Sequence, residues 1–170
     1  MSKTKIEIRG LYKIFGPKDK SFVNDVKNGI SKQDLLDKHN HVLGLNNINL
    51  SIPEKKVQVI MGLSGSGKST LIRHVNRLIE PTAGELIVDG ENVLKMSTEQ
   101  LMEFRRKSTS MVFQKFALLP HKTVSQNVAY GLTIQGYKET LAKEKSHRWI
   151  DRVGLSGFEE RYPAQLSGGM

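Results

Sequence analysis

Residues 62–69 point most directly to a chemistry: they read Gly-Leu-Ser-Gly-Ser-Gly-Lys-Ser and match G-x-x-x-x-G-K-[S/T] at every position. Glycines allow successive backbone N–H groups to turn toward a polyphosphate without Cβ clashes. The helix expected over residues 70–79 directs the positive end of its dipole at the same anion. The apolar run 57–61 predicts the strand that must precede such a loop. The pattern therefore predicts a phosphate cradle in which Lys68 reaches the β- and γ-phosphates and Ser69 ligates Mg²⁺.

The segments around this loop change from β-type to helical patterns along the chain. Apolar runs and alternating apolar residues predict strands at residues 5–9, 11–15, 46–52, 85–88 and 110–113. Capping residues and helical periodicity predict helices at residues 97–107, 124–134 and 138–153. Residues 17–45 are polar and read as an insertion, which contains a helix start capped by Ser31 and Asp34. β-rich segments thus dominate up to about residue 114, and helices follow.

The composition limits the classes of protein to which this chain can belong. A chain of 170 residues can bury one ordinary core. No apolar stretch approaches the roughly 18 residues that a membrane-spanning helix needs, and the N-terminus lacks the apolar segment of a signal peptide. The absence of cysteine excludes disulfides and thiolate metal sites, and it fits a cytosolic protein.

The net charge of +9, with an isoelectric point near 9.8, raises the question of a nucleic-acid partner. The basic residues are dispersed, however, and the few aromatic residues are not interleaved with arginines as a single-strand platform requires. A basic surface near phosphates or lipid headgroups is the better interpretation, and no nucleic acid is expected as a partner. The five histidines show no paired carboxylate or metal-ligand spacing, so we expect them to be structural or surface residues.

Three further features accompany the phosphate-loop pattern in a fixed order. Phe15 lies in the segment Tyr-Lys-Ile-Phe-Gly upstream of the loop, Gln114 follows the apolar run 111–113, and residues 166–170 read Leu-Ser-Gly-Gly-Met. Together with residues 62–69 they resemble the A-loop, Walker A loop, Q-loop and signature of the ATP-binding subunits of ABC transporters. The resemblance implies an α/β P-loop NTPase fold of the ABC type, with a β-rich N-terminal part, a phosphate-loop α/β core and an α-helical subdomain.

The resemblance also assigns roles to individual residues, with ATP and Mg²⁺ as cofactors. Phe15 would stack on adenine, with Tyr12 as the second candidate. Gln114 would contact Mg²⁺ or the attacking water, so that Lys68 and Gln114 would be the catalytic residues. The phosphate cradle would comprise Gly62, Ser64, Gly65, Ser66, Gly67, Lys68, Ser69 and Thr70. The residues that would contact the γ-phosphate of ATP held by a second subunit, in a head-to-tail dimer, are Ser167, Gly168 and Gly169.

The same resemblance divides the chain into parts. Residues 1–114 would form the β-rich and phosphate-loop core, which includes the insertion 17–45. Residues 115–165 would form the helical subdomain, which meets the membrane-spanning permease. Residues 166–170 would begin the signature helix.

A narrower resemblance is to the bacterial ATPases that energise the import of glycine betaine, proline or a related quaternary amine. Leu63 and Ser64 in the loop and the insertion 17–45 are its most specific marks. It implies a peripheral protein on the cytoplasmic face of the inner membrane, together with a permease and, indirectly, a separate periplasmic or extracellular solute-binding protein. The alternatives are an importer of amino acids or polyamines, a non-transport ABC protein acting on DNA or ribosomes, and a nucleotide-binding module without hydrolysis.

Some elements of the family are absent from the 170 residues. Family members continue past the signature to the Walker B aspartate, an adjacent catalytic glutamate, a D-loop and a switch histidine. Glu159 and Glu160 follow a polar turn and cannot be that glutamate. The base typically contributes about 10²–10⁴-fold, so we expect these 170 residues alone to be nearly inactive as an ATPase. We also expect a sheet truncated before the Walker B strand, with an open edge.

Overall fold

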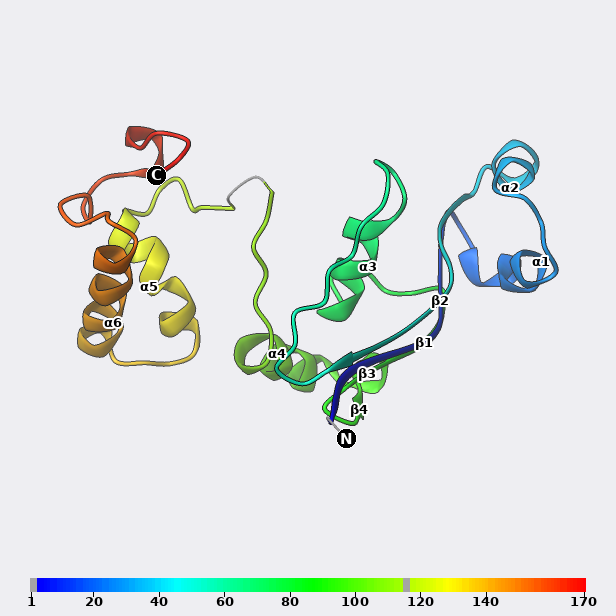
Figure 1. Ribbon diagram of the computed structural model, residues 1–170, viewed down its shortest axis with the longest axis horizontal. Coiled ribbons are helices and arrows are strands. Elements are labelled where there is room, and N and C mark those ends of the chain that lie inside the picture. Colours follow the sequence, from blue (N-terminus) through cyan, green and yellow to red (C-terminus); the bar gives the residue numbers. More distant parts are fainter. Residues whose placement is uncertain (1–2, 115–116) are drawn as a thin grey trace. The chain divides into compact units, whose positions relative to one another are not determined.

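The computed structural model describes residues 3–114 and 117–170. The chain divides into unit 1 (Met1–Leu101) and unit 2 (Met102–Met170), whose elements are drawn in Figure 1. The division lies inside helix α4 (Thr98–Lys107), whereas the family resemblance predicts a helical subdomain from residue 115 onward. Residues 115 and 116, at that predicted start, lie outside the described residues.

The strands of unit 1 form one antiparallel sheet in the order β2-β1-β3-β4. Their bounds are Thr4–Phe15 for β1, Val42–Pro53 for β2, Ala83–Val88 for β3 and Glu91–Asn92 for β4. The strands predicted at residues 5–9, 11–15, 46–52 and 85–88 are therefore confirmed. Between β3 and β4, Asp89 and Gly90 have φ angles of 52° and 87°, as a type I′ hairpin turn requires.

A register shift in β1 sets which residues reach the core. It falls between Ile8 and Leu11, where Gly10 has a φ of 53°. Such a bulge places two residues of one strand opposite one residue of its neighbour, and alternation resumes in a new phase. Ile8 and Leu11 are therefore both buried although they are three residues apart.

The insertion folds into a small helical lobe between β1 and β2. It contains η1 (Asp19–Phe22), α1 (Val23–Lys27) and α2 (Lys32–His39). The Ser31 hydroxyl accepts a hydrogen bond from Asp34 N at 2.9 Å, which confirms the predicted cap of α2. The lobe packs against the two strands through a cluster of buried residues made of Tyr12, Ile14, Val26, Leu35 and Leu43.

Helix α3 (Lys68–Val75) follows the phosphate loop directly and buries Leu71 and His74. The sequence predicts helix to residue 79, but α3 ends at Val75 because Arg77 adopts a left-handed conformation with a φ of 52°. The Arg77 guanidinium donates hydrogen bonds to Val93 O and Met96 O, at 3.1 and 3.0 Å, and so connects this end to η2 (Val93–Lys95). The predicted helix at residues 97–107 is confirmed as α4.

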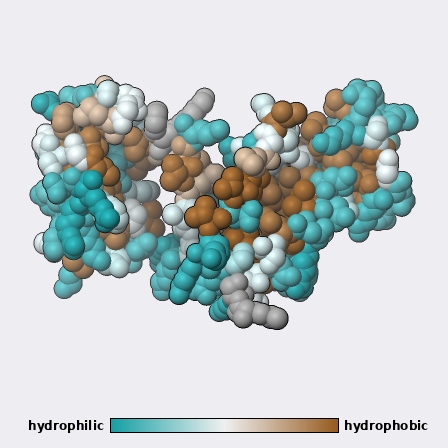
Figure 2. Space-filling model, in the orientation of Figure 1, coloured by the Kyte–Doolittle hydropathy of each residue, from teal (hydrophilic) through white to brown (hydrophobic). Residues whose placement is uncertain are grey.

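Two predicted strands, at residues 57–61 and 110–113, are absent from the described structure. Their apolar side chains lie in solvent: Val57 is 91% exposed, Met61 86% and Val112 97%. Interior strands of a parallel sheet are stabilised by neighbours on both sides, and within residues 3–114 and 117–170 no strand pairs with either segment. Figure 2 shows hydrophobic residues at the surface of unit 1, over the part where Figure 1 places α3 and the loop before it.

Unit 2 is built on two helices that pack together, α5 (Val124–Ile134) and α6 (Glu139–Arg152). Thr123 and Gln126 form a capping box at the start of α5, and Gly154 follows α6 with a φ of 73°. The helices predicted at residues 124–134 and 138–153 are thus confirmed. A short η3 (Pro163–Gln165) precedes a turn over residues 167–170. Among the described residues, none of the helices combines the length and the apolar content that crossing a bilayer needs.

Candidate nucleotide site

The backbone of the phosphate loop binds the ammonium group of Lys68. Lys68 Nζ donates hydrogen bonds to the carbonyl oxygens of Gly62 and Leu63, at 2.8 and 2.6 Å, and lies 3.4 Å from Ser66 Oγ. Lys68 is the first residue of α3, so its side chain curls back over the loop that precedes the helix. The positive charge is therefore held beside the backbone of the loop and the positive end of the α3 dipole, where an anion would be attracted.

Two glycines of this loop have backbone conformations that other residues rarely adopt. Gly65 has a φ of 77°, and Gly67, which caps α3, has a φ of 91°. Gly67 is also constrained by space, because a Cβ there would lie 2.6 Å from Gly44 O and 3.0 Å from a methyl carbon of Leu45. The glycine spacing found in the sequence thus has a physical basis in both the turn and its approach to β2.

Gly44 brings the predicted base-stacking residue next to the loop. A Cβ at Gly44 would lie 2.6 Å from Phe15 Cε2, so the ring of Phe15 packs directly on the backbone of β2. The same glycine therefore contacts Phe15 through one side and Gly67 through its carbonyl oxygen. Phe15 is 40% exposed, whereas Tyr12 is 7% exposed and belongs to the core cluster. Exposure favours Phe15 over Tyr12 for stacking on a base.

Sequence reasoning did not identify Gly44 as part of the site. The signal available was a glycine inside a strand, a position that often marks the close approach of another backbone or a ligand. Gly44 lies in β2 and has no positive φ, so its backbone conformation does not require glycine. Glycine is required because a Cβ at this position would collide with the ring of Phe15. The site therefore consists of the loop, Phe15 and a strand glycine that separates them.

The groups available for a metal ion are neutral. Ser69 is exposed on the first turn of α3, and Gln114 is exposed in a turn of unit 2. Within the described ranges, no group of three or more histidine, cysteine, aspartate or glutamate residues could hold a metal ion. Magnesium is usually bound by one or two carboxylates together with substrate phosphates and water. A hydroxyl and an amide oxygen therefore fit Mg²⁺ only as partners of phosphate oxygens.

In the last turn of α3, His74 is fully buried, and one of its ring nitrogens has no hydrogen-bond partner among the described residues. Its Nδ1 lies 2.7 Å from Thr70 O, whereas its Nε2 has no hydrogen-bond partner among the described residues. The contact with a carbonyl oxygen identifies Nδ1 as the protonated nitrogen of a neutral ring. Burial lowers the pKa of His74 below its ordinary value of 6.5, because a charged ring would lose its hydration. The sequence-based expectation of a structural histidine agrees with this position.

Asn127 organises residues 119–123, directly before α5. The two N–H groups of its side chain are shared among the carbonyl oxygens of Leu119, Lys122 and Thr123, which lie 3.1, 2.9 and 3.0 Å from the nitrogen. Its side-chain oxygen accepts from Leu119 N at 2.8 Å. Sequence reasoning did not identify this residue either; the only signal was an asparagine in the first turn of a helix, where its side chain competes for backbone groups.

Residues 167–169 of the predicted signature are exposed in a tight turn. Met170 N donates a hydrogen bond to Ser167 O at 3.0 Å, which closes the turn. Apart from its own chain neighbours, no described residue comes within 4 Å of the position that a Cβ would take at Gly168 or at Gly169. The described residues therefore show an exposed Ser-Gly-Gly turn at the place where the resemblance predicts the start of a helix.

Comparison with known proteins places this site in a family. A sequence profile described as ABC transporter matches residues 45–170, which is most of the chain. The chain belongs to the ABC transporter family. The ABC-type α/β fold is confirmed by a solved dimeric cassette, MJ0796, in a post-hydrolysis state bound to ADP and Pi. This ABC cassette superposes with a TM-score of 0.78 at 26% identity, over 96% of this chain and 64% of that one.

Among curated ABC relatives, this chain is similar to glycine betaine transport ATP-binding proteins. It is 48% identical to OpuAA of Bacillus subtilis (strain 168), over 98% of this chain and 40% of that protein. It is 46% identical to the glycine betaine/proline betaine protein ProV of Escherichia coli (strain K12), over 98% of this chain and 42% of that one. The chain thus spans about 40% of the length of these relatives. The narrower resemblance noted in the sequence is confirmed.

Proposed function

We propose that this chain forms part of an ATP-hydrolysing subunit that energises the import of glycine betaine, proline or a related quaternary amine. The observation that carries the proposal is a glycine loop whose carbonyl oxygens bind the ammonium of Lys68. Gly44 of β2 lies against both Gly67 of that loop and the exposed ring of Phe15. Similarity to glycine betaine transport ATP-binding proteins supports the solute class. The solute itself would be bound by a permease and a separate solute-binding protein.

ATP and Mg²⁺ are the cofactors that these residues fit. Loop N–H groups and Lys68 would hold the phosphates, and the Ser69 hydroxyl would orient the metal ion. Gln114 would hold the attacking water or the metal through its amide oxygen, which has two lone pairs to offer. Bound Mg²⁺ supplies charge neutralisation at the phosphates during phosphoryl transfer.

The exposed Ser167–Gly169 turn supports a site completed by a second subunit. A hydroxyl and glycine N–H groups without flanking side chains suit contact with a phosphate anion. In a head-to-tail dimer this turn would face the nucleotide held by the partner. The solved relative MJ0796 is a dimer, which makes this arrangement the first to test.

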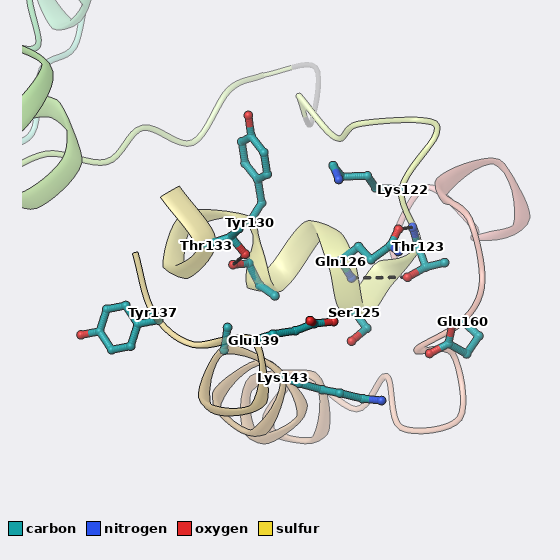
Figure 3. Close-up of a pocket in the computed structure, with 12 residues that line it drawn as sticks. Lys122, Thr123, Ser125, Gln126, Tyr130, Thr133, Tyr137, Glu139, Lys143 and Glu160 are labelled. Carbon is teal, nitrogen blue, oxygen red and sulfur yellow. Dashed lines mark hydrogen bonds between the residues drawn. The ribbon is translucent and has the colours of Figure 1, made fainter. Parts of the chain in front are cut away.

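A groove on unit 2 is our candidate for the permease contact. It lies between α5 and α6 and has a volume of about 490 Å³. Figure 3 shows that side chains of both charges line it. Lys122 and Lys143 supply the positive charges, and Glu139 and Glu160 supply the negative ones. Tyr130 and Tyr137 add apolar surface with hydroxyl ends, a composition common at protein interfaces. Such a contact would place the subunit at the cytoplasmic face of the inner membrane.

Replacement of Lys68 tests the function directly. In cells that depend on this system, Lys68→Ala should reduce the uptake of labelled glycine betaine by about 10²-fold or more, because a preorganised charge at the phosphates is lost. Lys56→Ala, which replaces an exposed lysine upstream of the loop, is the matched control and should transport normally. Unchanged uptake in Lys68→Ala would exclude an energising role. Competition with amino acids and polyamines distinguishes the alternative solutes.

A further inference from the structure

We propose that Lys13 is a positioning residue for the nucleotide base: its ammonium group rests on the ring of Phe15 and holds that ring for stacking on adenine. This inference rests on the proposed ATP binding and adds a residue to which the resemblance assigns no role. Lys13 lies on β1, the same strand as the ring that it would hold.

Lys13 and Phe15 are placed together by the strand that carries them. Both lie on β1, two residues apart, so their side chains leave the same face of the strand. Lys13 Nζ stands over the Phe15 ring, 5.1 Å from its centroid. An ammonium at this distance is attracted by the negative face of the ring.

The Lys13 side chain is sheltered to a degree that is unusual for a lysine. It is only 14% exposed, whereas lysine side chains mostly lie in water. Phe15 by contrast is 40% exposed. The ring therefore contacts Gly44 at one edge and Lys13 over one face, and it keeps a large surface free.

An ion pair with Asp19, which is itself held by a hydrogen bond from Thr82, fixes the position of Lys13. Its Nζ lies 3.7 Å from Asp19 Oδ2, and Asp19 accepts a hydrogen bond from the hydroxyl of Thr82 at 2.6 Å. Thr82 in turn accepts from Ile14 N at 2.9 Å and is itself buried. The Thr82 hydroxyl, with a smaller contribution from the charge of Lys13, lowers the pKa of Asp19, so the carboxylate stays ionised beside the ammonium. Lys13 is thus held in place by Asp19, at the start of the insertion, and Asp19 is in turn fixed by Thr82.

This arrangement has two consequences for a base that stacks on the free face. The ring loses rotational freedom before the ligand arrives, which reduces the entropy cost of binding. The cation also draws π-electron density toward its own side, which leaves the opposite face better matched to an electron-rich purine. Both effects act on the base and neither acts on the phosphates.

The chain offers a matched control a few residues away. Lys27, at the end of α1, places its Nζ 5.8 Å from the centroid of the Tyr12 ring, which is the same type of contact with another ring of β1. Tyr12 lies 7% exposed in the core cluster, where no base can reach it. Removing the charge of Lys27 therefore reproduces the loss of a cation–π contact without touching the base site.

The test is calorimetric titration of the full-length protein with ATP and, separately, with tripolyphosphate, which lacks the base. Lys13→Leu should weaken ATP binding roughly threefold, in line with a partly exposed cation–π contact, and leave tripolyphosphate binding unchanged. Lys27→Leu should change neither. Phe15→Ala should weaken ATP binding more, and adding Lys13→Leu to it should have no further effect. Lys13→Arg, which keeps a cation over the ring, should retain the ATP affinity of the natural protein.

Each other outcome counts against the proposal. Equal losses for ATP and tripolyphosphate in Lys13→Leu would mean that Lys13 acts on the phosphates or on the fold. No loss, or a loss that persists in the Phe15→Ala background, would mean that the ring is not what Lys13 positions. If Lys13→Leu does not fold, a loss of ATP affinity in the folded Lys13→Arg protein overturns the proposal, and retention supports it. A natural protein that binds neither ligand would instead overturn the proposed function.

Discussion

At the scale of single residues, Gly44 separates two contacts that a nucleotide would need at once. The side-chain ring of Phe15 packs against Gly44, and the backbone of Gly67 packs against the carbonyl oxygen of Gly44. A side chain can move away from an added methyl group, whereas a glycine with a φ of 91° cannot accept a Cβ without strain. Substitutions at the two glycines should therefore affect different parts of the ligand.

Gly44→Ala should weaken ATP binding by about fivefold, because the new methyl group pushes Phe15 from its place and reduces stacking, an interaction usually worth about 1–3 kcal/mol. Tripolyphosphate binding should stay normal. Gly67→Ala should abolish binding of both ligands, because the loop and the start of α3 must rearrange. Calorimetry with the two ligands checks both variants, and loss of tripolyphosphate binding in Gly44→Ala would refute the separation.

At the scale of elements, local patterns predicted most of the fold. Caps at Ser31 and Thr123 and the turn at residues 89–90 are interactions within a few residues, so the sequence shows them directly. The loop at residues 62–69 is a local motif in the same sense. The segments 57–61 and 110–113 failed as strand predictions because strand formation depends on neighbours that no local pattern contains.

The parts of the site that sequence reasoning missed are non-local. Gly44 contacts Gly67 across separate elements, and Lys13 is held by Asp19 and Thr82 from different parts of the chain. Such contacts can be identified only when strand register and packing are known, because the spacing of these residues in the sequence follows neither the helical nor the strand period. A single sequence therefore predicts the phosphate loop and leaves its supporting residues unidentified.

Asn127 should be the most sensitive polar residue at the start of α5. Asn127→Ala removes two N–H donors, which three carbonyl oxygens share, and one accepted bond. Each hydrogen bond typically contributes about 0.5–1.5 kcal/mol. We expect unit 2 to lose about 2–3 kcal/mol of unfolding free energy, measured by denaturant titration. Gln135→Ala, which removes one bond to Arg106 O, is the control and should cost at most about 1 kcal/mol. Equal losses would contradict the bracing role of Asn127.

At the scale of the whole molecule, the predicted site residues are divided between the two units. Phe15 and the phosphate loop belong to unit 1, whereas Gln114 and the turn Ser167–Gly169 belong to unit 2. The groups proposed to hold the base and the phosphates, together with the metal-orienting Ser69, thus come from unit 1, and those proposed to act on the attacking water and the partner's nucleotide come from unit 2. Substitutions should therefore separate ATP binding from ATP hydrolysis. Variants of the unit 1 residues should reduce both, whereas variants of the unit 2 residues should mainly reduce hydrolysis.

The unfolding free energy of unit 1 should depend on pH through His74. Burial lowers the pKa of His74 in the folded state, so below pH 6.5 the unfolded chain binds a proton that the folded chain excludes. The stabilisation is complete above pH 6.5 and is lost as pH falls toward the folded pKa, with a slope of at most about 1.4 kcal/mol per pH unit. Denaturant titrations followed by circular dichroism should show this slope in the natural protein and a smaller one in His74→Leu. Identical slopes in His74→Leu and the natural protein would exclude His74 as the group that couples folding to pH.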